Sequence, residues 1–322
     1  MKAGVIITVA LTAVTTGVEP VAAFDLQGHR GARGLVAENT LAGFAEALQI
    51  GVTTLESDLG VTKDGVLVHA HDRVLNPDIV RGPDGNWLSA PTAAINALTL
   101  AELKRFDVGR LNPSSKYAQQ FSGQRAADGE RIPTFAEVAD LVAKSGKPVR
   151  FNLETKLSPD KPDETVDADT FARLVVEAVR AAGLALRVTI QSFDWRTLLA
   201  AKKLAPEIET VCLTYKTTLE DRVEAGSRRP SAWLAGLDPR DFGGSIPRLV
   251  ATTGCGTWSP YFRELDAAAV AEAHAAGLKV VPWTINDSAD MARIIDMKVD
   301  GLITDYPDRA RKVMADKGLS LP

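Results

Sequence analysis

Eighteen residues early in the chain, LESDLGVTKDGVLVHAHD, begin with two closely spaced carboxylates, Glu56 and Asp58, and end with two closely spaced histidines. The chain of 322 residues has only four histidines, so this stretch holds half of them. Glu56 and Asp58 are two residues apart, as are His69 and His71, and such side chains in a strand point to the same face. Carboxylates can hold a metal ion and histidines can transfer protons, so these residues are the first candidates for an active site.

The same stretch predicts a β-hairpin. Its linker is too short for the crossover that parallel strands require, and Asp64-Gly65 is a strong signal for a two-residue turn. Such a turn places Asp58 opposite His71, and Gly60 opposite His69. All four reactive side chains are then expected on one face. A surface hairpin with a polar face is the simpler alternative.

Two other strand-like segments end in groups of the same kind. GHRG puts His29 and Arg30 at the end of the first strand, and NLETK puts Glu154 and Lys156 at the end of another. Three carboxylates, the two of the hairpin and Glu154, suit Mg²⁺ or Ca²⁺ better than Zn²⁺. Arg30 can hold a phosphate through two hydrogen bonds, and two histidines can serve as general base and general acid. The set predicts phosphoryl transfer.

The elements that must position these residues alternate along the chain. Helical patterns are expected at residues 39–51, 134–146, 167–183, 264–277 and 287–301. Strands are expected at residues 26–31, 54–60, 149–155, 188–193, 210–215, 255–260, 279–285 and 301–307. Eight strands alternating with helices predict a TIM (β/α)8 barrel, in which the C-terminal strand ends carry the active site. A doubly wound open sheet is the alternative, weakened because no Gly-rich nucleotide motif follows the first strand.

Residues 73–132 break this rhythm. They are rich in Gly, Pro, Asn and Ser and hold one short helical piece, at 100–106. A connection this long is usually functional or a small subdomain. We therefore expect a single barrel domain over 24–322, with a hairpin extension after the second strand and an insertion over the active face.

The N-terminal residues have a different composition. Lys2 is followed by an apolar run over 5–18 and by small residues up to Ala23, which is the pattern of a signal peptide over 1–23. The apolar run is short for a bilayer span, although an uncleaved anchor is the alternative. We expect export, with the periplasm favoured over full secretion, and no stable membrane insertion after cleavage.

The overall composition limits the partners. The formal net charge is −4, so there is no basic excess and no nucleic-acid partner is expected. Cys212 and Cys255 either form a disulfide, which an oxidising compartment permits, or stay as buried free thiols. The oligomeric state is left open.

At this point the sequence resembles a known family. GHRGARGLVAENT, LESDLGVTKDGVLVHAHD, NLETK, PWTIND and DGLITDYP, in this order, resemble the motifs of the glycerophosphodiester phosphodiesterases. The resemblance covers about residues 26–307. It implies a TIM barrel that cleaves a small-molecule glycerophosphodiester to glycerol 3-phosphate and an alcohol, with one divalent cation, Ca²⁺ or Mg²⁺. One departure is Ala37, which stands where the usual PENT motif has proline.

The resemblance also implies roles for individual residues. The catalytic histidines are His29 and His71, the substrate-binding residues are Arg30, Lys156 and Trp283, and the metal ligands are Glu56, Asp58 and Glu154. Trp283 is expected either in the wall of the glycerol pocket or in the core. His69 is expected beside His71, near the metal or the substrate. Asn286 and Asp305, near strand ends, are interpreted as ordinary capping residues.

Several mechanisms and functions remain open. In one mechanism a histidine deprotonates the glycerol 2-hydroxyl, which attacks phosphorus to give a cyclic phosphate, while the other histidine protonates the leaving alkoxide. Direct attack by water is the alternative. A phospholipase D-like enzyme acting on lysolipids or sphingolipids is a second function, and a non-catalytic exported binding protein is a third.

Overall fold

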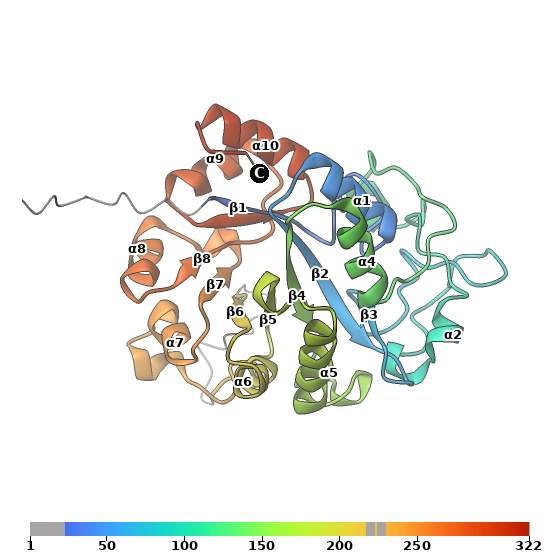
Figure 1. The fold of residues 1–322 in the computed structure, drawn as a ribbon, viewed down its shortest axis with the longest axis horizontal. Coiled ribbons are helices and arrows are strands. Elements are labelled where there is room, and N and C mark those ends of the chain that lie inside the picture. Colours follow the sequence, from blue (N-terminus) through green and yellow to red (C-terminus); the bar gives the residue numbers. More distant parts are fainter. Residues whose placement is uncertain (1–22, 217–222, 224–229, 322) are drawn as a thin grey trace, which may run out of the picture.

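The computed structural model of the chain describes residues 23–216, 223 and 230–321. In this part, eight parallel strands and the helices between them form a nearly closed barrel (Figure 1). The predicted signal peptide lies outside the described residues, apart from Ala23. The predicted TIM barrel is confirmed, and the doubly wound sheet was the wrong alternative.

The barrel strands follow one another in the order β8-β7-β6-β5-β4-β2-β1-β9. Their bounds are β1 Asp25–Gly28, β2 Thr54–Val61, β4 Arg150–Thr155, β5 Val188–Ser192, β6 Glu209–Thr214, β7 Thr257–Pro260, β8 Lys279–Val280 and β9 Gly301–Thr304. Backbone hydrogen bonds join the two ends of this row, from Asp300 to Val280 (2.9 Å) and from Ile303 to Pro282 (3.0 Å). The C-terminal ends of the strands therefore meet at one rim.

The helices lie outside the strands (Figure 1). Their bounds are α1 Leu41–Ile50, α2 Leu100–Leu103, α3 Lys116–Gln120, α4 Phe135–Ser145, α5 Ala168–Ala181, α6 Trp195–Leu204, α7 Ile246–Thr252, α8 Ala267–Ala275, α9 Ser288–Asp296 and α10 Pro307–Asp316. Thr134 and Glu137 form the predicted capping box of α4, and Gly146 ends this helix at a positive φ of 67°. The sequence patterns had not indicated α3, α6, α7 and α10.

The hairpin after β2 forms, but with a different register from the predicted one. The return strand β3, Leu67–His69, pairs antiparallel with β2 and places His69 opposite Leu59. Thr62 donates its N–H to the Val66 carbonyl (3.0 Å), so the loop has three residues, and Gly65 takes a positive φ of 79°. A three-residue loop with glycine in this conformation is the next common hairpin type. The expected pairing of Asp58 with His71 is therefore wrong.

The insertion 73–132 packs on the side of the barrel that carries β3 (Figure 1). It has its own small apolar cluster, separate from the main core between strands and helices. This cluster consists of Val68, Leu75, Val80, Ile95, Leu103, Val108 and Ile132. The expected helical piece is present as α2, and its capping box uses Thr99 and Glu102.

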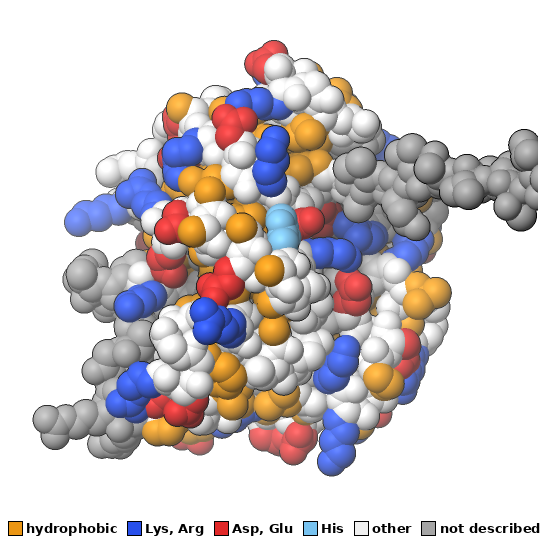
Figure 2. Space-filling view, turned by 90° about the vertical axis from the view of Figure 1, so that its left-hand side faces the viewer, with side chains coloured by type: hydrophobic (Ala, Val, Ile, Leu, Met, Phe, Trp, Pro, Cys, Tyr) orange, Lys and Arg blue, Asp and Glu red, His pale blue; other side chains and the backbone are white. Residues whose placement is uncertain are grey.

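Other features concern the whole described chain. A disulfide joins Cys212 in β6 to Cys255, which decides between the two alternatives for these residues. Among the described residues, no helix is both long enough and apolar enough to span a bilayer. On the face drawn in Figure 2, basic and acidic side chains are interspersed.

Candidate active site

Three buried carboxylates meet at the C-terminal ends of β2 and β4. The two strands are neighbours, and their register pairs Asp58 with Glu154. One oxygen atom from each of Glu56, Asp58 and Glu154 lies within 4.8 Å of the others. The structure therefore brings together the three predicted metal ligands.

Burial and neighbouring charges shift the pKa values of Glu56 and Asp58 in opposite directions. Burial and the nearby charge of Asp58 raise the pKa of Glu56 well above its usual value. Burial alone would raise the pKa of Asp58 too, but Arg30, His71 and Lys156 outweigh it and hold that pKa well below normal. Asp58 Oδ1 is buried without a hydrogen bond, and its nearest cation, Lys156 Nζ, is 3.6 Å away. Three hard oxygen ligands and an unsatisfied carboxylate oxygen fit a divalent cation.

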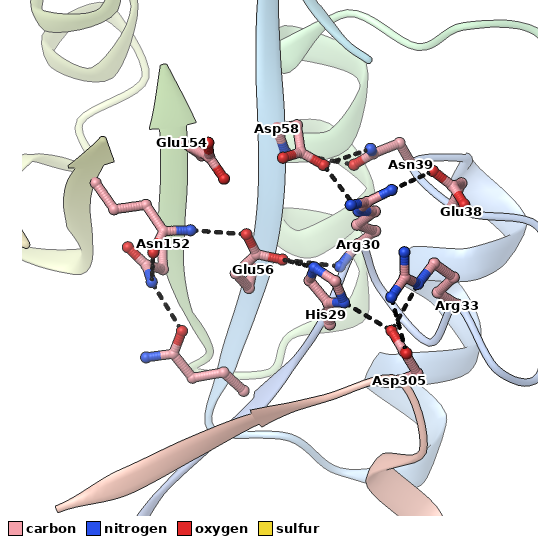
Figure 3. A network of polar contacts seen from close by, with 12 residues as sticks. His29, Arg30, Arg33, Glu38, Asn39, Glu56, Asp58, Asn152, Glu154 and Asp305 are labelled. Carbon is pink, nitrogen blue, oxygen red and sulfur yellow. Dashed lines mark hydrogen bonds and ion pairs between the residues drawn. The ribbon is translucent and has the colours of Figure 1, made fainter. Parts of the chain in front are cut away.

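Arg30 connects β1 to these acids (Figure 3). Its backbone N–H donates to Glu56 Oε2 (2.9 Å), and its guanidinium lies 2.7 Å from Glu38 Oε1 and 3.3 Å from Asp58 Oδ2. Asn39 donates its amide to the same Asp58 oxygen (2.9 Å). Residues 37–40, the AENT segment before α1, thus hold the side chains of Arg30 and Asp58 in place.

His29 is held in one orientation by Asp305, at the end of β9 (Figure 3). Its Nδ1 lies 2.6 Å from Asp305 Oδ1, and Arg33 donates two hydrogen bonds to the same carboxylate, at 2.7 and 2.9 Å. Burial and Arg33 lower the pKa of His29 to about 4, although Asp305 opposes this shift. At neutral pH the ring is therefore uncharged. Nδ1–H donates a hydrogen bond to the Asp305 carboxylate, which leaves Nε2, 3.9 Å from Glu56 Oε2, free to accept a proton.

His71 enters the same region from the hairpin, just beyond β3. Its Nδ1 lies 2.9 Å from Asp72 Oδ1, and Asn76 donates to the other Asp72 oxygen (2.6 Å). Burial, Arg30 and Lys156 lower the pKa of His71, while Asp72 opposes the shift. Both predicted catalytic histidines thus have a carboxylate on Nδ1.

His69 does not join them. Its ring lies between Phe44 and Phe135, with centroid distances of 5.2 and 6.4 Å. The observed register pairs it with Leu59, a core residue, whereas the predicted register had placed it on the face of the two acids. β3 ends at His69, so the strand alternation no longer governs His71. The expected placement of His69 near the metal or the substrate is wrong.

The reactive groups line two connected pockets. The inner pocket, about 160 Å³, is lined by His29, Arg30, Glu56 and Gln191, among others. The outer pocket, about 600 Å³, is lined partly by insertion residues. Five residues line both pockets: His71, Glu154, Lys156, Phe193 and Trp283. The insertion is therefore one wall of the site.

The other predicted substrate-binding residues are also located here. Lys156 Nζ donates to Glu154 Oε1 (2.7 Å). The Trp283 indole N–H donates to the Ser259 carbonyl (3.0 Å), and its ring packs 5.3 Å from that of Phe193. Of the two expected positions for Trp283, the structure supports the pocket wall.

Sequence reasoning missed several partners of the site. Asp305 is not an ordinary cap, because it binds His29 and Arg33. Gln191, by contrast, is expected from the sequence either in the barrel mouth or in a packing layer of the barrel, and the structure shows that it donates to Glu56 Oε1 (2.7 Å) from β5. Tyr117, in the insertion, hydrogen-bonds to Glu38. Position at a strand's C-terminal end was the available signal for Asp305, whereas nothing local marked Tyr117.

Known proteins resemble this chain over most of its length. The Glycerophosphoryl diester phosphodiesterase family matches residues 29–309. A glycerophosphodiester phosphodiesterase of Caldanaerobacter subterraneus is 30% identical over 87% of this chain and 93% of its own length. One of Bacillus subtilis is 28% identical over 88% of this chain and 84% of its own length.

Solved structures give the same result. One from Silicibacter pomeroyi, assigned as a glycerophosphoryl diester phosphodiesterase, has a TM-score of 0.82 and 33% identity, with 94% of this chain and 97% of that chain covered. An Oleispira antarctica phosphodiesterase in complex with the product sn-glycerol-3-phosphate has a TM-score of 0.65 and 26% identity, with 90% and 96% covered. The chain belongs to the glycerophosphoryl diester phosphodiesterase family and is an enzyme of that activity.

Proposed function

We propose that this enzyme hydrolyses glycerophosphodiesters to sn-glycerol 3-phosphate and an alcohol, and that the reaction depends on one divalent cation. The observation that carries the proposal is the cluster of three buried carboxylates beside Arg30 and Lys156. Two of the acids, Glu56 and Glu154, line the same pocket as both histidines. The product bound to the Oleispira antarctica phosphodiesterase, sn-glycerol-3-phosphate, supports the proposed product here.

Glu56, Asp58 and Glu154 would hold the cation, Ca²⁺ or Mg²⁺. When bound, such an ion supplies positive charge that stabilises the phosphate oxygens as charge develops on them. Arg30 and Lys156 add two fixed positive charges at the same place. Because the guanidinium of Arg30 is already bound to Glu38, it is positioned before the substrate arrives.

His29 is the general base in this proposal. Its proton on Nδ1 is held by Asp305, so Nε2 can accept a proton from the attacking hydroxyl. That hydroxyl is either the glycerol 2-hydroxyl, which gives a cyclic phosphate that water then opens, or a water molecule. Turnover of a substrate without the 2-hydroxyl separates the two routes, since undiminished turnover would exclude the cyclic one.

His71 is the general acid. It lines both pockets, so it lies where an alcohol leaving toward the outer pocket needs a proton. The carboxylate of Asp72 on Nδ1 opposes the lowering of the His71 pKa that burial, Arg30 and Lys156 cause, and it holds the ring in place. The two histidines then act on opposite sides of the phosphorus centre.

The test uses the mature chain, from about Phe24, stripped of metal. We expect release of glycerol 3-phosphate from glycerophosphocholine only after Ca²⁺ or Mg²⁺ is added, and loss of release in both His29→Ala and His71→Ala. The variant His274→Ala, which alters a surface histidine, is the control. Full activity without metal, or in either site variant, would contradict the proposal. Release of choline from lysophosphatidylcholine, with no cleavage of glycerophosphocholine, would favour the lysolipid alternative.

We also propose that the protein is exported, to the periplasm rather than the medium. The support is the composition of residues 1–23 and the Cys212–Cys255 disulfide, a bond that persists in oxidising compartments. The mass of the protein recovered from the periplasmic fraction tests this, because cleavage should leave a chain that begins near Phe24. An uncleaved chain in the cytoplasm would contradict it.

A further inference from the structure

We propose that the outer pocket binds the alcohol part of the substrate and selects an alcohol that carries a positively charged ammonium group. This inference rests on the proposed function, and it adds a class of substrate to it. Three observations support it: the arrangement of the two pockets, the charges that line the outer one, and its aromatic wall.

The arrangement of the pockets decides which part of the substrate goes where. The inner pocket of about 160 Å³ is lined by groups assigned above to the cation, Glu56 and Glu154, and to the phosphate, Arg30 and Lys156. The outer pocket of about 600 Å³ continues from it through five shared residues. The alcohol bound to the same phosphate must therefore extend into the outer pocket.

The outer pocket has an excess of acidic side chains. Beyond the residues shared with the inner pocket, it is lined by three acids, Asp72, Asp78 and Glu164, and one base, Arg73. Arg73 is already paired with Glu164 (2.9 Å). Among the described residues, no donor or cation contacts the carboxylate of Asp78. An ammonium group there would gain an ion pair, whereas an anionic alcohol would be repelled.

Aromatic rings also line this pocket. Phe193, Tyr215 and Trp283 line the outer pocket, and Trp283 packs 5.5 Å from Tyr215 and 5.3 Å from Phe193, measured between ring centroids. Faces of Trp and Tyr attract cations, and quaternary ammonium groups are the ligands most often bound in this way. Acids and aromatic rings in one pocket are the two features that recognise such a group.

The test compares two substrates of the same shape. One is glycerophosphocholine, and the other is its uncharged isostere, in which a 3,3-dimethylbutyl group replaces choline. Both give sn-glycerol 3-phosphate, and kcat/KM is measured for each at saturating metal. We expect a preference of roughly tenfold for the choline substrate. Equal values would overturn the inference while leaving the proposed function intact, and no product from either substrate would instead refute the proposed function.

Variants of two pocket residues test whether the preference for the choline substrate arises in the outer pocket. Asp78→Asn and Tyr215→Leu are each expected to lower the preference several-fold, mainly through a higher KM for the choline substrate. Asp84→Asn, in the same insertion but outside the pocket, is the matched control and should keep the preference. Its carboxylate binds Asn86 and no pocket residue. A preference that persists in both pocket variants would overturn the assignment to this pocket.

Discussion

His69 gives a prediction about stability that does not depend on the substrate. The side chain is 1% exposed, and both ring nitrogens lack a hydrogen-bond partner among the described residues. Burial lowers its pKa from 6.5 to about 3. In the unfolded chain the ring regains the higher value, so at mildly acidic pH the unfolded state binds a proton that the folded state does not.

The direction and size of the pH effect on stability follow from this difference in pKa. Because the pKa in the folded state is the lower one, the folded state loses stability as the pH falls from 6.5 toward 3, and the loss levels off below that range. Each pH unit within the window costs about 1.4 kcal/mol of the free energy of unfolding. At pH 4.5 the cost relative to neutral pH is therefore about 2.7 kcal/mol.

The variant His69→Gln removes the titrating ring. We expect it to lose some stability at pH 7, because the ring no longer packs between Phe44 and Phe135. That loss should shrink steadily as the pH falls. The assay is urea unfolding, followed by tryptophan fluorescence on metal-free protein at several pH values, with His274→Gln as the control for loss of an exposed imidazole. Wild type and His69→Gln curves that stay parallel from pH 7 to pH 4 would refute the reasoning.

Three further predictions concern the site and the core. Asp305→Asn should lower kcat roughly tenfold to a hundredfold with little change in KM, because the His29 ring loses the carboxylate that orients it. A change in KM alone would contradict this positioning role. Metal at a hundred times its dissociation constant should stabilise the wild type by about 2.7 kcal/mol, and a thermal shift that persists in Glu154→Gln would place the metal elsewhere. The double variant Cys212→Ala, Cys255→Ala should lose about 4 kcal/mol of the free energy of unfolding, because the disulfide closes a loop of 43 residues. A urea midpoint equal to that of the wild type would contradict this.

The alternation of strands and helices was readable from the sequence, because it depends on local patterns. Glycine at the end of α1 and α4, and the capping box of α4, are signals within a few residues of each other. Short helices such as α3 and α7 were missed, since five and seven residues are too few to show a helical repeat of apolar positions. The chemistry was readable for the same reason: acids, histidines and cations stood at predicted strand ends, where a barrel gathers them.

By itself, therefore, the sequence determined the barrel, its reactive rim and the resemblance to a phosphodiesterase family. Only the tertiary structure decided how those groups are partnered. His29 and Asp305 are 276 residues apart, and they meet only because β1 and β9 pair in the barrel. A shift of one residue in the hairpin register placed His69 in the core, because one extra loop residue exchanges the two faces of a strand. Contacts between distant segments depend on the packing of the whole chain, which no local pattern contains.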